Sequence, residues 1–139
     1  MTLPFKVEYS IVCDHIRRED NGKLILIGVY GGSILVPSLP AAFGLSQFVR
    51  VTPTGPGAAD VEFRVLFEGT EIAKAEAHLA IGPTQDQALI SLGPFPIAVD
   101  RAGMLRFEIR EKGKRWTRLD EARVGVNPAA SSSVTSPPS

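Results

Sequence analysis

The stretch VEFRVLFEGTEIAKAEAHLAI, residues 61–81, predicts two β-strands joined by a tight turn. In its first half, apolar residues at every second position alternate with Glu62 and Arg64, the pattern of a strand with one buried face. The turn falls at Glu68-Gly69, where a glycine supplies the positive φ that short hairpin turns require. This stretch therefore indicates a β-hairpin.

The second half of the stretch, residues 71–81, has a rival interpretation. Its Ala, Glu and Lys residues favour a helix by intrinsic propensity. Alanine and leucine nevertheless alternate with Lys74, Glu76 and His78, and this period of two fits a strand better than a helix. We expect a strand here.

The same alternation recurs along the chain, and residues 105–126 repeat the strand–turn–strand pattern of residues 61–81. The pattern predicts an all-β, two-sheet antiparallel β-sandwich of about eight strands, immunoglobulin-like or jelly-roll-like, with one of the two hairpins at the rim of each sheet. The expected strands are FKVEYSIVC (5–13), LILIGVY (24–30), LSQFVRVT (45–52), DVEFRVLF (60–67), EIAKAEAHLAI (71–81), ALISLGPFPIAV (88–99), MLRFEIRE (104–111) and RLDEARVGV (118–126).

The chain is expected to form one sandwich domain over residues 1–126. The remaining residues, NPAASSSVTSPPS (127–139), are rich in Ser, Pro and Ala and nearly without apolar bulk. Such a segment buries too little surface to offset the entropy lost on ordering. We therefore expect a disordered tail from Asn127 onward.

Composition excludes several classes of function. Fifteen Lys and Arg balance fifteen Asp and Glu, so no basic footprint for nucleic acid is expected. The opening residues lack the basic and apolar regions of a signal peptide, and no apolar run is long enough to span a membrane. A single cysteine, Cys13, excludes an internal disulfide. A cytoplasmic protein is the expectation.

The stretch VCDHIRREDNGKLILIGVYGG, residues 12–32, concentrates polar side chains between two apolar runs. Asn21-Gly22 predicts a two-residue hairpin turn, which would place Cys13 opposite Tyr30. Residues 5–13 point their odd-numbered side chains inward, but Ile16 lies on the even set, so one residue must be absorbed between them. We expect a β-bulge at Asp14-His15, and a central strand covered on both faces at 24–30.

The same stretch resembles the opening signature of a family of short, uncharacterised bacterial proteins, a domain of unknown function. The resemblance implies kinship and fold but no activity, and His15 stands where the family often carries a second acid. The matching positions are Cys13, Asp14, Arg17, Glu19, Asn21, Gly22, Lys23, Gly28, Val29 and Tyr30.

Neither a metal site nor a nucleophile is expected at Cys13. Two ligands on one strand face, Cys13 and His15, would still need two more, and the only other histidine is His78. A cysteine in the core is inert as a nucleophile. Asp14 is expected to cap backbone N–H groups freed by the bulge. We predict no catalytic, cofactor-binding or metal-binding residues and no cofactor.

Two other places invite a binding interpretation. Trp116, beside the last turn, could stack on a ligand together with Arg115, although a lone tryptophan in a small sandwich is typical of the core. The apolar residues Leu39 and Phe43 lie in an expected irregular connection, where they would form an interaction surface.

The sequence favours a non-catalytic, cytoplasmic binding module whose partner is another protein or a second copy of the chain, since the edge strands of a sandwich must be covered or blunted. The alternative is a small-molecule-binding or enzymatic sandwich with a polar rim site formed by Asp14, His15, Arg17 and Glu19. That site requires these side chains to converge in a concave pocket.

Overall fold

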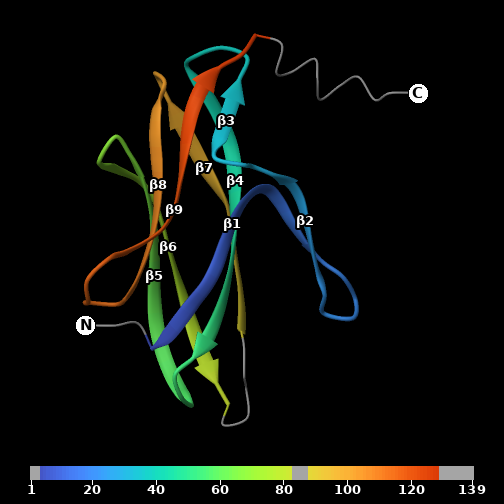
Figure 1. Cartoon of the computed structure of the whole chain (residues 1–139), viewed down its shortest axis with the longest axis vertical. Helices are drawn as coiled ribbons and strands as arrows, with labels where there is room; N and C mark the ends of the chain where they lie inside the picture. The colour runs from blue at the N-terminus through green and yellow to red at the C-terminus, as the bar shows by residue number, and fades with distance from the viewer. Residues whose placement is uncertain (1–3, 83–87, 129–139) are drawn as a thin grey trace.

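Two stacked β-sheets form the molecule in a computed structural model that describes residues 4–82 and 88–128 (Figure 1). One sheet has four strands in the order β2-β1-β4-β7. Its strands are β1 (Phe5–Arg18), β2 (Leu24–Val29), β4 (Ala41–Pro53) and β7 (Ala88–Val99). The prediction of an all-β sandwich is confirmed.

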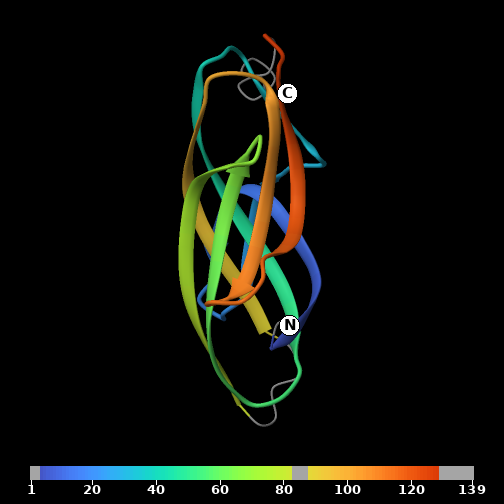
Figure 2. The same ribbon diagram turned by 90° about the vertical axis from the view of Figure 1, so that its left-hand side faces the viewer.

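The second sheet has five strands in the order β3-β9-β8-β5-β6, and Figure 2 looks onto it. Its strands are β3 (Ser33–Val36), β9 (Thr117–Val126), β8 (Gly103–Glu111), β5 (Gly57–Phe67) and β6 (Thr70–Ile81). The orders β9-β8-β5-β6 and β1-β4-β7 match the G-F-C-C′ and A-B-E orders of immunoglobulin domains. Of the two topologies left open by the sequence, the structure has the immunoglobulin-like one.

The predicted number of about eight strands is close to the nine that the described residues form. The additional strand is the short β3 (Ser33–Val36), which pairs with β9 in parallel. The predicted placement of the two hairpins was wrong. The hairpins β5–β6 and β8–β9 lie side by side in one sheet, not at the rims of two sheets. Residues 70–81 are a strand as expected, and Glu68 (φ 48°) and Gly69 (φ 87°) form their hairpin turn with positive φ at both positions.

The core lies between the sheets and is continuous across them. The alternating side chains of β5 are buried as predicted, with Phe63 only 1% exposed. They pack in one cluster with Phe107 of β8 and with Leu45 and Val49 of β4. The two sheets therefore share a single apolar core.

The strand β2 was predicted to be central, and this was wrong. It is the edge of the four-stranded sheet, and among the described residues it pairs only with β1. Its burial alternates between half-buried and exposed residues up to Ile27. A continuous apolar run was taken as a strand covered on both faces, but here one face of the run is exposed to solvent.

The β1–β2 hairpin exists, with a different turn and register. Gly22 donates its backbone N–H to the Glu19 carbonyl (3.0 Å), and Glu19 donates its backbone N–H to the Lys23 carbonyl (2.8 Å). Only Gly22 has positive φ in this turn (86°), as in a three-residue loop with a bulge at its glycine. Because the loop has three residues, Cys13 pairs with Val29 and not with Tyr30.

The bulge predicted at Asp14-His15 was also misplaced. Cys13 pairs with Val29 and His15 with Ile27, so the register is the same on both sides of Asp14. The extra residue is absorbed earlier, between Val7 and Tyr9, where β1 pairs with β4. Directly after this bulge the alternation is reversed, which leaves Tyr9 44% exposed and Val12 buried.

The C-terminal strand leads directly to the end of the described chain. Asn127 donates its backbone N–H to the carbonyl of Val36 (2.9 Å), so order extends to the first residue of the predicted tail. Residues 129–139 of that tail lie outside the described residues.

Candidate interaction surface

The end of β1 and the whole of β2 form a two-stranded ribbon at one side of the sandwich (Figure 1). Pairing between β1 and β4 stops at Cys13, opposite Ser46. From there β4 continues beside β7, while residues 14–18 of β1 pair with β2 alone in the part of the chain that the structure describes. We call residues 14–29 the ribbon.

One face of the ribbon carries a row of exposed apolar side chains. Ile25 is 44% exposed, Ile27 42% and Val29 58%. Their partners on β1 are Arg17, His15 and Cys13, respectively, and strand alternation places all six on the same face. We call Ile25, Ile27 and Val29 the apolar row.

A cross-strand contact fixes the base of the ribbon. The Tyr30 hydroxyl donates a hydrogen bond to the carboxylate of Asp14. Gly28 of β2 has positive φ (71°), and a side chain there would collide with the Asp14 carboxylate. Burial, reinforced by the bond to Asp14, raises the pKa of Tyr30. These three residues form what we call the Asp14 clasp.

The structural role of Asp14 thus differs from the one predicted. Its carboxylate accepts from the hydroxyl of Tyr30, the residue directly after β2, and it does not cap the N–H groups of a bulge. Its backbone carbonyl accepts from the Ser46 hydroxyl (3.5 Å), which connects the ribbon to β4.

The other polar residues predicted for a rim site do not converge. His15, Arg17 and Glu19 are exposed, and among the described residues their side chains make no hydrogen bond or ion pair. Two hollows of the surface lie elsewhere, at about 420 Å³ beside Ala42 and Ala98 and about 430 Å³ beside Pro94 and Pro96. The geometry thus gives no support to a concave rim site.

Cys13 is fully buried. Burial raises the pKa of its thiol, and the sulfur lies 3.5 Å from the carbonyl oxygen of His15. Within residues 4–82 and 88–128, no three His, Cys, Asp or Glu side chains lie together as metal ligands. No helix in the same residues is long and apolar enough to cross a membrane.

The two predicted apolar contact residues are less exposed than the sequence indicated. Phe43 belongs to β4 and not to an irregular connection, and Leu39 lies in the bend before that strand. Both are half-buried and pack against the core. The exposed apolar side chains of the four-stranded sheet are instead Tyr9, Leu89 and the apolar row.

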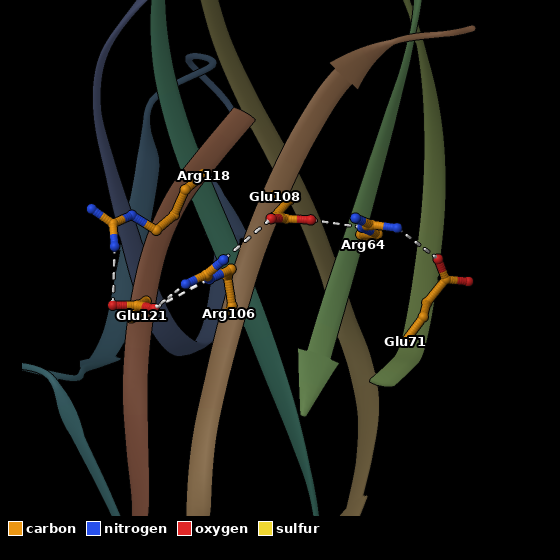
Figure 3. A network of polar contacts seen from close by, with 6 residues as sticks. All are labelled: Arg64, Glu71, Arg106, Glu108, Arg118 and Glu121. Atoms are coloured by element: carbon orange, nitrogen blue, oxygen red, sulfur yellow. Dashed lines mark hydrogen bonds and ion pairs between the residues drawn. The ribbon is translucent and has the colours of Figure 1, made fainter. Parts of the chain in front are cut away.

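The outer face of the five-stranded sheet has the opposite character. Charges of alternating sign run across it from β6 to β9 and form an ion-pair ladder (Figure 3). Arg64 Nε lies 2.7 Å from Glu108 Oε1, and Arg106 Nη2 lies 3.1 Å from Glu121 Oε2. The ladder consists of Glu71, Arg64, Glu108, Arg106, Glu121 and Arg118.

A second row of charges runs beside the ladder. Glu62 bonds to Arg110 at 2.7 Å and to Lys74 at 3.2 Å. The hydrogen bond from Arg110 is the main cause that lowers the pKa of Glu62, although the residue is buried. These charges are satisfied by one another, so Glu62, Arg110 and Lys74 are already paired within this face.

Trp116 belongs to this charged face and not to the core. The guanidinium carbon of Arg64 lies 4.2 Å from the centre of the indole ring, and that of Arg110 lies 4.3 Å from it. Such cation–π contacts are favourable, more so where water is partly excluded. The tryptophan therefore covers the arginines that bond to Glu62 and Glu108. The sequence showed these charges alternating on single strands but did not show which strands are neighbours.

A model of a family of unknown function, DUF6941, matches residues 8–120 of the chain. No curated protein matches the sequence. The matched residues include the whole ribbon, the Asp14 clasp and every residue of the ion-pair ladder except Glu121.

Proposed function

Since the chain belongs to the family of unknown function DUF6941, whose description names no activity, we propose from its own surface that it is a non-catalytic protein-binding module. The ribbon would take up an extended strand of a partner protein along the edge of β2. The observation that carries this proposal is the apolar row, exposed on an edge strand that has no second neighbour among residues 4–82 and 88–128.

A free two-stranded ribbon is a weak structure in water. Isolated hairpins are at best marginally stable, and a third strand with an apolar face is what makes such sheets persist. An exposed apolar edge also risks uncontrolled pairing, which natural proteins blunt or cover. A ribbon kept with an apolar face therefore supports the idea that a partner supplies the third strand.

The mode of binding follows from the geometry of strands. An added strand is held by main-chain hydrogen bonds to the edge, and side chains at every second position provide specificity. The partner segment would place apolar residues beside Ile25, Ile27 and Val29. Exposed His15 and Arg17 lie on the same face and favour an acidic residue at the segment's end.

The remaining surface supports this choice of site. The opposite outer face carries the ion-pair ladder, whose charges are already paired. Half-buried Leu39 and Phe43 lie in the four-stranded layer and would add little contact area. The proposed setting is the bacterial cytoplasm, where a lone, buried cysteine is stable as a thiol.

A peptide library tests the proposal. Displayed extended peptides should yield binders with apolar residues at every second position, and these should slow amide hydrogen exchange in residues 24–29. Ile27→Glu should abolish binding, because a charge in the centre of the apolar row would be desolvated. Leu89→Glu, at an exposed position on β7, is the matched control and should bind normally. Binding that survives Ile27→Glu, or a library without binders, would refute the proposal.

A further inference from the structure

We propose that β2 pairs with β2 of a second copy of this chain. This pairing would join the four-stranded sheets of the two copies edge to edge. This inference rests on the proposed function, since it uses the same edge and the same apolar row. The two copies would be related by a two-fold axis through Ile27, with their β2 strands antiparallel.

The first argument is the symmetry of the apolar row. Ile25, Ile27 and Val29 are spaced evenly about Ile27 on one face of β2. An antiparallel copy centred on Ile27 therefore places Ile27 opposite its own counterpart and Ile25 opposite Val29 of the second copy. Directly opposed apolar side chains on one sheet face stabilise strand pairing. A two-fold interface requires such self-complementarity.

The pattern also selects the register. An axis one residue earlier, through Leu26, would place Val29 opposite Lys23 of the second copy. That pairing would set a charged side chain against the most exposed member of the apolar row. Only the axis through Ile27 pairs all three apolar residues with one another. A shift of the strand register by one residue would place the apolar row of one copy on the opposite sheet face from that of the other.

Charge does not oppose this arrangement. The formal net charge of the chain is zero, so two copies do not repel each other as a whole. Arg17 pairs with Ile25 near the tip of the ribbon. In the antiparallel dimer the two tips point in opposite directions, which keeps Arg17 of one copy at the far end of the joined sheet from Arg17 of the other.

The size of the contact sets the expected strength. Stable specific interfaces bury about 1,200–2,000 Å² in total, and smaller contacts are typical of weak or transient encounters. Pairing one six-residue strand with its copy is a small contact of this second kind. The dimer should therefore be weak, and it should exchange with partner strands that compete for the same edge.

Sedimentation velocity on the full chain, from micromolar to millimolar concentration, tests the inference. The average mass of the wild type should rise toward that of a dimer, and Ile27→Glu should remain a monomer throughout. Leu89→Glu should dimerise like the wild type. Circular dichroism and thermal unfolding establish that each variant is folded, which is expected because Ile27 and Leu89 are both exposed.

Cross-linking tests the register. Under mild oxidation Ile27→Cys should form a disulfide-linked dimer, because the axis brings its two copies directly opposite each other, whereas Leu89→Cys should stay monomeric. Both variants also carry Cys13→Ala, because the native thiol lies beside the backbone of Ile27 and could pair with the new cysteine within one copy. A wild type that is monomeric at every concentration, or a dimer untouched by Ile27→Glu, would overturn the inference. If alternating peptides still bind the ribbon of a monomeric protein, the proposed function stands without it.

Discussion

Gly28 leaves room for the Asp14 carboxylate at the base of the ribbon. Its φ of 71° is unfavourable for any residue with a side chain, and the Asp14 carboxylate occupies the space that a methyl group would need. Gly28→Ala should therefore lower the free energy of unfolding by about 2–3 kcal/mol, combining backbone strain with a collision. Urea unfolding measures the loss.

Gly22 supplies the matched control for this prediction. It also has positive φ (86°), but nothing lies within 4 Å of the added methyl group. Gly22→Ala should cost only the backbone strain, about 1–2 kcal/mol. The loss of unfolding free energy should be larger for Gly28→Ala than for Gly22→Ala. This difference should shrink when Asp14 is also replaced by alanine, because the effects of contacting residues are coupled. Equal losses at the two glycines would mean that the Asp14 contact contributes nothing.

Tyr30 should make the fold sensitive to alkali. Burial and the bond to Asp14 raise its pKa in the folded state above the ordinary value of 10.0. The protonated hydroxyl therefore stabilises the fold below pH 10.0, and this contribution is lost as pH rises through the folded-state pKa. Between about pH 8 and pH 11, the free energy of unfolding should fall more steeply with rising pH for the wild type than for Tyr30→Phe. Parallel curves for the two proteins would contradict this role.

The residues of the Asp14 clasp were easier to predict from the sequence than the contacts between them. Asp14, Gly28 and Tyr30 all belong to the stretch that resembled the family signature, and Asp14 was expected to have a structural role. The partner of Asp14 was missed because a shift of one residue in register changes which side chains face each other. That shift came from the turn, where Asn21-Gly22 fits both a two-residue and a three-residue loop.

At the scale of strands, buried charges tie β5 to β8 and β6. Glu62 is buried and bonded to Arg110 and Lys74, which holds its pKa below the ordinary value of 4.5. The stabilisation from its charge is present above pH 4.5 and is lost as pH falls through the lower folded-state pKa. Glu62→Gln should therefore be less stable than the wild type at neutral pH, with the difference shrinking in acid.

Glu76→Gln is the control for this measurement. Glu76 lies on the same sheet, and its ion pair with Lys112 is long (3.8 Å) and exposed, so its loss should leave stability nearly unchanged. Urea unfolding of both variants near neutral pH and near pH 3 makes the comparison. A Glu62→Gln protein as stable as the wild type at neutral pH would show that burial of the charge cancels its pairing.

Strand positions were predictable, but strand neighbours were not. Alternation placed eight of the nine strands close to their observed positions, because a half-buried strand leaves its period in the sequence. The short strand β3 is only four residues long and follows a double glycine, which gave it no such signal. The edge position of β2 was equally hidden, since an apolar run looks the same in a central strand and in a strand that awaits a partner.

At the scale of the whole molecule, one core joins two layers with contrasting outer faces. The ion-pair ladder covers the five-stranded layer, whereas the four-stranded layer exposes Tyr9, Leu89 and the apolar row. An antiparallel sheet usually has one apolar face toward the core and one polar face toward water. The four-stranded layer departs from this rule near the ribbon, which is where the proposed function places a partner.

The shared core predicts that both layers unfold together. Phe107 is fully buried in the cluster that contacts both sheets, so Phe107→Ala should lower the free energy of unfolding by about 3–5 kcal/mol. This is a large share of the 5–15 kcal/mol by which native domains are stable, and the variant should be close to unfolding. A probe in either layer should report the full loss of unfolding free energy.

Two built-in probes can check this, one in each layer. The single tryptophan, Trp116, reports on the five-stranded sheet through its fluorescence, and Cys13 reports on the four-stranded sheet through its reaction with a thiol reagent. Cys13 should react slowly in the native protein, because it is buried and its pKa is raised. In a two-state protein the denaturant midpoints from both probes coincide and shift equally in Phe107→Ala. Because the ribbon extends beyond the core, its amides should exchange before either probe responds. Separate midpoints for Trp116 and Cys13 would instead mean that the layers fold as independent units.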